Sequence, residues 1–170
     1  MMARAARPLS PMEWIGLPLI AALLASFVLA VPVRIAGLQA PEPVFALIPA
    51  FAWGLGRPSA LPPFALIVLG LGLDLLWGGP LGLWPLCLLA AYALVFSARR
   101  VLAGQEFLAL WGAYAVAGMA AMIVGFTLSG LRAGNAPSLV GVGLQFVVTA
   151  ALYPFAWRLI ERYEAQDARF

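Results

Sequence analysis

Long apolar runs, interrupted by short segments that carry Arg, Pro and Gly, follow one another along almost the whole chain. Of its 170 residues, 64% are hydrophobic and only 10% are charged, whereas soluble domains carry roughly 25% charged residues. So few charges cannot cover a surface that faces water. The composition therefore predicts an all-α polytopic membrane protein, folded as a single integral-membrane domain over residues 1–170 with no separate soluble domain.

The lengths of the apolar runs predict six transmembrane helices in a compact bundle. The first run follows Arg4 and Arg7, as in a signal peptide, but at about 20 residues it is long enough to span the hydrocarbon layer. We therefore expect a retained helix. The second run is the shortest, and its Pro49 is expected to kink the helix. The spans are expected at about 14–33, 42–56, 61–77, 81–97, 107–130 and 138–160.

The arginines test this count, because cytoplasmic loops of membrane proteins carry an excess of positive charge. The chain has no Lys, so its 10 basic residues are all Arg. With the N-terminus in the cytoplasm, only Arg34 and Arg132 fall outside, and the other arginines fall inside: Arg4, Arg7, Arg57, Arg99, Arg100, Arg158, Arg162 and Arg169. This bias favours six spans with both termini cytoplasmic. Arginines at span ends indicate topology and contact with lipid headgroups, so we expect no nucleic-acid partner.

The residue types argue against catalysis. The chain has no His, which removes the commonest general base and the commonest metal ligand. Its one cysteine, Cys87, excludes an intrachain disulfide and a cysteine cluster that binds metal. We therefore expect no catalytic residue, no metal site and no cofactor.

Asp74 is the one side chain between Leu61 and Ser97 that carries a charge at neutral pH. A carboxylate at the centre of a bilayer costs about 2.5 to 3.5 kcal/mol on insertion scales, so Asp74 must be accommodated. Six spans place it at the outer end of the third span, one turn before the break at Gly78-Gly79-Pro80. It is expected to lie in water at the interface or to bond the free N–H groups at the start of the fourth helix. Contact with a partner and coupling to ions or protons are the alternatives, and no second buried acid supports the latter.

Small and polar residues recur at helical spacing in three places. Gly70 precedes Asp74 by four residues, and the series Ala117, Ala121 and Gly125 repeats at intervals of four. Such stripes let helices approach closely in lipid, and we expect packing inside the bundle. Gln145 and Thr149 lie one turn apart in the sixth run, where they are expected to form interhelical hydrogen bonds or, alternatively, part of a ligand site.

Residues 57–92 contain a Pro-led helix, then Gly-x-x-x-Asp-Leu, then a short Gly-rich break that closes in Leu-Gly. The residues that carry this pattern are Arg57, Pro58, Gly70, Asp74, Leu75, Gly78, Pro80, Leu81 and Gly82. In this pattern the chain resembles the rod shape-determining protein MreD family. Pro43 and Tyr153-Pro154 are weaker matches, and the length and six spans also fit.

This resemblance implies a non-catalytic subunit of the bacterial cell-elongation complex, located in the inner membrane. Such a subunit would associate with the bitopic protein MreC, and would help to couple MreB filaments to RodA and its penicillin-binding transpeptidase. The hairpin residues of the pattern would then be structural or would contact the partner. The family is also similar to the substrate-binding subunits of energy-coupling factor transporters, which makes a small-molecule-binding membrane subunit the alternative.

Overall fold

The structure is a computed structural model, and it describes residues 12–29, 34–35, 38–39, 43–56, 58–133 and 139–167. This part of the chain is almost entirely helical, with one pair of two-residue antiparallel strands. A π-helical turn, Met12–Gly16, leads directly into the first α-helix. The remaining elements are α1 (Leu17–Leu29), β1 (Arg34–Ile35), β2 (Leu38–Gln39), α2 (Leu47–Leu55), α3 (Leu61–Trp77), α4 (Leu83–Leu102), α5 (Phe107–Ala133), α6 (Leu139–Ala151) and α7 (Tyr153–Asp167).

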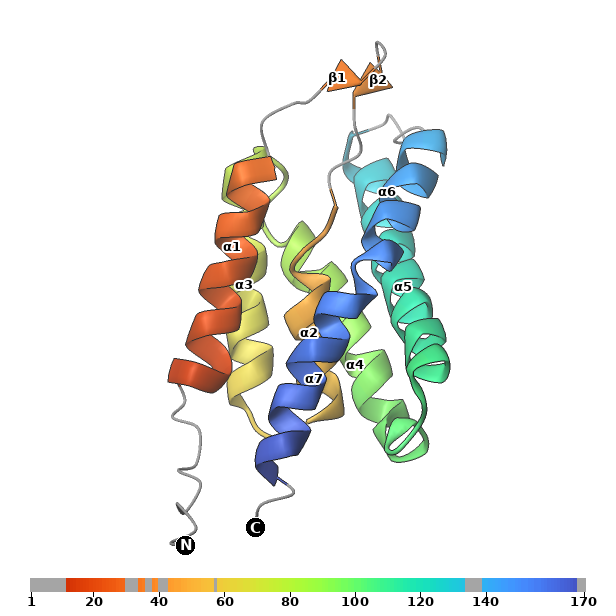
Figure 1. The fold of residues 1–170 in the computed structure, drawn as a ribbon. Helices are drawn as coiled ribbons and strands as arrows, with labels where there is room; N and C mark the ends of the chain where they lie inside the picture. Colours follow the sequence, from red (N-terminus) through yellow and green to blue (C-terminus); the bar gives the residue numbers. More distant parts are fainter. Residues whose placement is uncertain are drawn as a thin grey trace, which may run out of the picture.

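The helices form one bundle in which successive helices run in opposite directions, except that α7 continues in the direction of α6 (Figure 1). Helices α1, α3 and α5 run toward the end of the bundle that carries β1 and β2, which we call the strand end. Helices α2, α4 and the α6–α7 pair run away from it. The α3–α4 turn therefore lies at the strand end, and the α4–α5 turn lies at the opposite end.

Helix α2 forms the centre of the bundle. It contacts α1, α3, α4, α5 and α7, and most of its side chains are fully buried. Trp53 on α2 is among them, and its indole Nε1–H donates to the backbone carbonyl of Trp14 at 3.2 Å. This bond joins the central helix to the turn that precedes α1. A helix this short has few backbone hydrogen bonds and depends on its packing against the neighbouring helices for stability.

The helix bounds agree with the expected spans in some places and differ in others. Helix α3 covers the same residues as the expected third span, whereas α2 is only 9 residues long and begins well after position 42. Pro49 lies in the first turn of α2, where a missing N–H costs nothing. The predicted kink at Pro49 is therefore wrong, because no helix precedes it.

The expected sixth span consists of two helices, α6 and α7, which meet at a turn at Leu152. Among the residues that the structure describes, three helical stretches are long and apolar enough to cross a membrane: Leu83–Leu102, Phe107–Leu131 and Val140–Glu161. Two apolar helices are shorter, Trp14–Val28 and Leu61–Trp77. The all-helical class is confirmed, and three of the helical stretches have the length and apolar composition that crossing a membrane requires.

Candidate functional site

Asp74 lies in the last turn of α3, and the residue is only 1% exposed. Its carboxylate accepts two backbone hydrogen bonds, from the N–H of Gly82 at 2.6 Å and from the N–H of Trp84 at 3.0 Å. Both donors lie at the start of α4, where the first N–H groups of a helix have no partner within the helix. Asp74 thus caps α4 from a different helix. Of the two structural roles expected for it, bonding the N–H groups at the start of the fourth helix is confirmed, and exposure to water is wrong.

The turn between α3 and α4 depends on two glycines. Gly78 and Gly82 have φ angles of 64° and 94°, in the left-handed region that glycine enters without strain. Gly78 ends α3, and the N–H of Gly79 donates to the main-chain carbonyl of Asp74 at 3.0 Å. The carbonyl of Pro80 then accepts the N–H of Leu83, the first residue of α4, at 3.1 Å. The sequence folds here into a short hairpin because the first N–H groups of α4 and the carbonyl of Asp74 at the end of α3 find partners within the turn.

Gly70 sets how closely α3 and α4 approach each other. A Cβ atom at this position would collide with the backbone nitrogen of Pro85 and would come within 2.6 Å of its Cα. Near the turn, the rings of Trp77 and Trp84 form an edge-to-face pair with centroids 4.8 Å apart. The expected packing role of the Gly70–Asp74 spacing is therefore present inside the α3–α4 hairpin.

Other residues of the family pattern lie on the outside of this hairpin. Pro80 and Leu81 are exposed at its tip, and Leu75 on α3 is also exposed. Pro58 is exposed in the segment before α3, and Arg57 lies outside the described residues. The pattern thus contains two buried residues, Gly70 and Asp74, that join α3 to α4, two turn glycines at the surface or partly buried, and further residues exposed around the tip.

The predicted stripe on α5 packs inside the bundle. Ala117 and Ala121 are buried, and a Cβ atom on Gly125 would lie 3.3 Å from the Sγ of Cys87 on α4. Small residues at intervals of four therefore bring α5 against α4.

Thr149 makes a hydrogen bond to the central segment of the bundle. Its Oγ1 accepts the backbone N–H of Val44 at 3.1 Å, and both residues are buried. Val44 precedes α2, so this bond satisfies a backbone donor that lies before the helix begins. Thr149 therefore bonds another part of the bundle, as expected, but its partner is the backbone before α2, so the bond is not the predicted one between two helices. Gln145 lies one turn earlier on α6 and is half-buried.

A cluster of aromatic side chains at the centre of the bundle was not predicted from the sequence. Phe51 on α2 packs edge-on against Tyr114 and Tyr153, with ring centroids 5.3 Å and 6.3 Å away. Phe107 and Trp157 extend the cluster toward the end opposite the strands. On α5, Phe107 and Tyr114 lie seven residues apart, and on α7, Tyr153 and Trp157 lie four apart, so each pair shares one helix face. Nothing in the sequence says that these two faces meet around α2.

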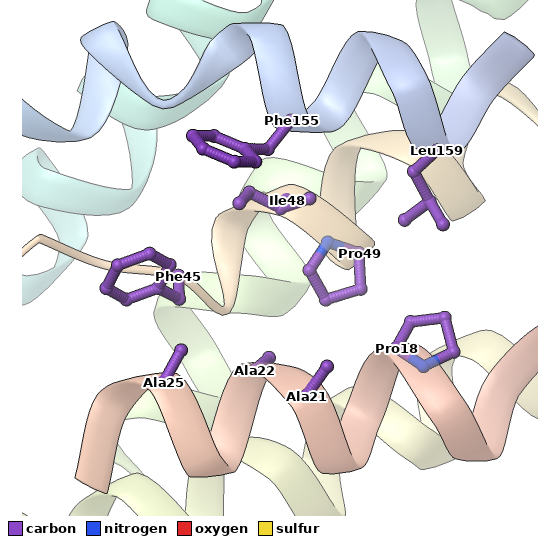
Figure 2. A pocket seen from close by; sticks show the side chains of 9 residues that line it. All are labelled: Pro18, Ala21, Ala22, Ala25, Phe45, Ile48, Pro49, Phe155 and Leu159. Atoms are coloured by element: carbon purple, nitrogen blue, oxygen red, sulfur yellow. The ribbon is translucent and has the colours of Figure 1, made fainter. Parts of the chain in front are cut away.

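Two apolar grooves lie beside α1. One, of about 360 Å³, separates α1 from α7 and has part of α2 as its floor (Figure 2). The other, of about 340 Å³, separates α1 from α3. Side chains lining both grooves are aliphatic or aromatic, apart from the Met12 thioether, so neither groove presents a charged group to a ligand.

Within the described residues, no three His, Cys, Asp or Glu side chains lie close enough together to hold a metal ion. Asp74 has its carboxylate occupied by backbone donors on α4. The arrangement is that of a packed hairpin with an exposed tip, which is suited to contact with another protein or with lipid. The chain matches no family model, no curated protein and no solved structure.

Proposed function

We propose that this chain is a non-catalytic subunit of the bacterial cell-elongation complex in the inner membrane. It would associate with an MreC-like bitopic protein, and through it link RodA and its penicillin-binding transpeptidase to MreB filaments. Its activity would be the maintenance of rod shape by holding these proteins together. In this role the chain needs contact surfaces and a rigid bundle, and it needs no reacting group.

The observation that carries the proposal is the way the MreD-like pattern forms one unit in space. Gly70 brings α3 against Pro85, Asp74 bonds the start of α4, and Gly78 and Gly82 shape the turn between them. The residues of the pattern therefore all shape one structure, the α3–α4 hairpin. A pattern whose members depend on one another in this way is a stronger basis for the resemblance than apolar helices alone.

The proposed membrane orientation has support from the described arginines. Arg99 and Arg100 lie in the last turn of α4, and Arg158 lies on α7. Both helices run toward the end opposite the strands (Figure 1). Helix α1 begins at this same end. We place this end in the cytoplasm, because positively charged residues are retained there. The strand end and the hairpin tip with Leu81 then face the periplasm, and six passes bring both termini to the cytoplasmic side.

One observation favours the alternative, a small-molecule-binding subunit of an energy-coupling factor type transporter. Helix α2 begins inside the bundle, and the break between α6 and α7 lies beside it, joined through Thr149 and Val44. Interrupted helices that meet inside a membrane form the binding sites of several transporter folds. The described residues near this junction offer few charged groups, so the partner-binding function has the better support.

Affinity purification separates the two functions. The tagged chain, expressed at its native level in bacterial membranes and extracted in mild detergent, is expected to retain an MreC-like bitopic protein at a ratio near one to one. Depletion of the chain is expected to make rod-shaped cells round. Recovery of an ATPase module in place of any MreC-like protein, with cells that stay rod-shaped, would contradict the scaffold function and support the transporter.

A matched pair of variants tests whether the hairpin tip contacts the partner. Leu81→Asp changes an exposed residue at the tip, and Val101→Asp changes an equally exposed residue near the end of α4, on the cytoplasmic side. Loss of the MreC-like protein from the first variant alone would assign the contact to the hairpin tip. Equal retention in both variants would exclude the tip as the contact surface.

A further inference from the structure

The groove between α1 and α7 is a narrow apolar slot (Figure 2). Its volume is about 360 Å³, and α2 forms its floor through Ile48 and Pro49. Alanines form much of the α1 wall, while Phe155 and Leu159 form the α7 wall. Every described residue that lines the slot has a side chain without a charge or a hydrogen-bonding group. A polar ligand would therefore lose its water there without gaining a partner, so the groove selects an apolar occupant.

The two walls of the groove are held apart by their contacts elsewhere. Helix α7 buries Tyr153 and Ile160 in the core and packs mainly on α2. The junction before it is fixed as well, because Pro154 has no N–H for the carbonyl of Ala150, and the indole Nε1–H of Trp111 donates to this carbonyl at 3.0 Å. Helix α1 packs on α2 and α3. The groove therefore stays open until another molecule fills it.

The groove has the length and depth of one lipid acyl chain. It extends along α1 from Pro18 to Ala25, a distance of about 10 Å at the rise of an α-helix. Pro18 lies in the first turn of α1, at the end of the bundle opposite the strands. Half of the hydrocarbon core of a bilayer is about 15 Å thick. The groove thus lies at the depth of the acyl chains in the leaflet on this side.

A helix from another protein fits the groove less well than an acyl chain does. With its side chains a helix is about 10–12 Å across, so 10 Å of its length would fill roughly 800 Å³ or more. This volume is at least twice that of the groove. The slot admits a single flexible chain, as a phospholipid provides.

Arg158 supplies a positive charge beside the groove, although it does not line it. It is exposed on α7, next to Leu159 and one turn after Phe155. Glu161 follows Leu159 by two positions, which places it on nearly the opposite side of the helix. Long arginine side chains at the end of an apolar segment keep their guanidinium group at the level of the lipid headgroups. A phosphate that pairs with Arg158 would have its acyl chain at the opening of the groove.

We propose that the groove binds one acyl chain of an anionic phospholipid, whose phosphate pairs with Arg158. The lipid comes from the leaflet at the end opposite the strands, which is the cytoplasmic leaflet in the proposed orientation. Anionic lipids attract basic residues at that surface. The bound chain fills the space between α1 and α7 and joins α1 to the rest of the bundle. This inference goes beyond the scaffold function and does not depend on which protein the chain binds.

Native mass spectrometry of the full chain tests the site. The protein is stripped of lipid in detergent and titrated with phosphatidylglycerol or phosphatidylethanolamine that carry the same acyl chains. Wild type is expected to bind the first phosphatidylglycerol more tightly than the first phosphatidylethanolamine. Arg158→Gln is expected to weaken phosphatidylglycerol binding about fivefold and to leave phosphatidylethanolamine binding unchanged. Equal affinities of the wild type for the two lipids would overturn the role of Arg158.

A matched pair of variants tests the acyl-chain slot. Ala21→Phe places a ring in the groove, and is expected to weaken the binding of the first phosphatidylglycerol about tenfold, as roughly two methylene groups lose their buried contact. Ala93→Phe makes the same change at an exposed position on α4 and should bind lipid like the wild type. Equal binding by the two variants would overturn the slot.

Photo-crosslinking keeps the test independent of how Ala21→Phe folds. A small diazirine amino acid at Ala25, which lines the groove, is activated in the full chain within bacterial membranes. It is expected to form a phospholipid adduct in higher yield than the same amino acid at Ala93. A crosslink from Ala25 to another protein would overturn the proposal in favour of a partner's transmembrane helix. Equal lipid yields at the two positions would overturn it in favour of unspecific contact with the bilayer.

Discussion

The carboxylate of Asp74 and the backbone N–H of Gly82 are joined by a hydrogen bond of 2.6 Å that closes the turn between α3 and α4. The same residue accepts a second bond through its main-chain carbonyl, from the N–H of Gly79 at 3.0 Å. The main-chain carbonyl of Asp74 therefore caps the end of α3, and its carboxylate caps the start of α4. A negative group at the start of α4 also interacts favourably with the helix dipole.

Replacement of Asp74 by Ala is expected to lower the free energy of unfolding by about 2–4 kcal/mol, because two partly buried N–H groups lose a charged acceptor. Asp74→Asn is expected to cost about half as much, since its amide oxygen can accept one of the two bonds. Membrane insertion should be intact in both variants. Unfolding in detergent micelles, followed by tryptophan fluorescence, measures the difference.

The matched control for Asp74 is Glu106→Gln, which makes the same change from acid to amide at an exposed position before α5. Its free energy of unfolding should stay within about 0.5 kcal/mol of the wild type. Wild-type stability of Asp74→Ala would show that the two backbone bonds do not hold the hairpin. It would also remove Asp74 from the candidate site.

Gly70→Ala is expected to destabilise the protein by about 1–3 kcal/mol, because the new methyl group meets the backbone of Pro85 and α4 must move away. Gly72→Ala, two residues further along α3, is the control. Its Cβ would meet the side-chain end of Leu23, which can rotate. The midpoint temperature of thermal unfolding should therefore be lower for Gly70→Ala than for Gly72→Ala. The reverse order would contradict the close approach of α3 and α4.

Thr149→Val removes the acceptor for the N–H of Val44 without changing the shape of the side chain, and is expected to cost about 1–3 kcal/mol. Thr149→Ser keeps the hydroxyl and should recover most of this loss. Thr127→Val is the control, because the exposed Thr127 hydroxyl bonds only carbonyls of its own helix. Chemical unfolding that shows equal effects for Thr149→Val and Thr127→Val would exclude a special role for the bond.

Gly125→Val is expected to lower the free energy of unfolding by about 1–3 kcal/mol, because the larger side chain meets the Sγ of Cys87. The double variant Gly125→Val with Cys87→Ala should lose at least about 0.5 kcal/mol less stability than the two single losses added together, since the two sites are in contact. Gly112→Val, where nothing lies within 4 Å of a new Cβ, is the control. Strictly additive effects would argue against the α4–α5 contact at this point.

The α3–α4 hairpin could be predicted in detail because its signals are local. Gly78-Gly79-Pro80 marks a turn wherever it occurs, and a Pro-led apolar run before it marks a helix. The expected third span and α3 consequently cover the same residues. One of the two structural roles considered for Asp74, bonding the N–H groups at the start of the fourth helix, also followed from sequence position, since those groups need an acceptor.

The break between α6 and α7 could not be predicted with the same certainty. Pro154 is visible in the sequence, but membrane helices tolerate proline, and a continuous span was expected. The donor that satisfies Ala150 comes from Trp111, which lies 39 residues earlier. A hydrogen bond between residues so far apart in the sequence depends on how α5 packs against α6, and no local pattern records it.

The sequence by itself determined that this chain forms apolar helices. It also determined the position of the turn between α3 and α4, and that one acid must be accommodated beside this turn. The tertiary structure decided that α2 lies at the centre of the bundle, that Asp74 is buried, and that Tyr114 and Tyr153 meet around Phe51. The reason is physical. Helices that are apolar on every face carry no amphipathic pattern, so their sequence does not say which face packs inward. Close approach at glycines and the pairing of a few polar groups select the arrangement, and both depend on residues that only folding brings together.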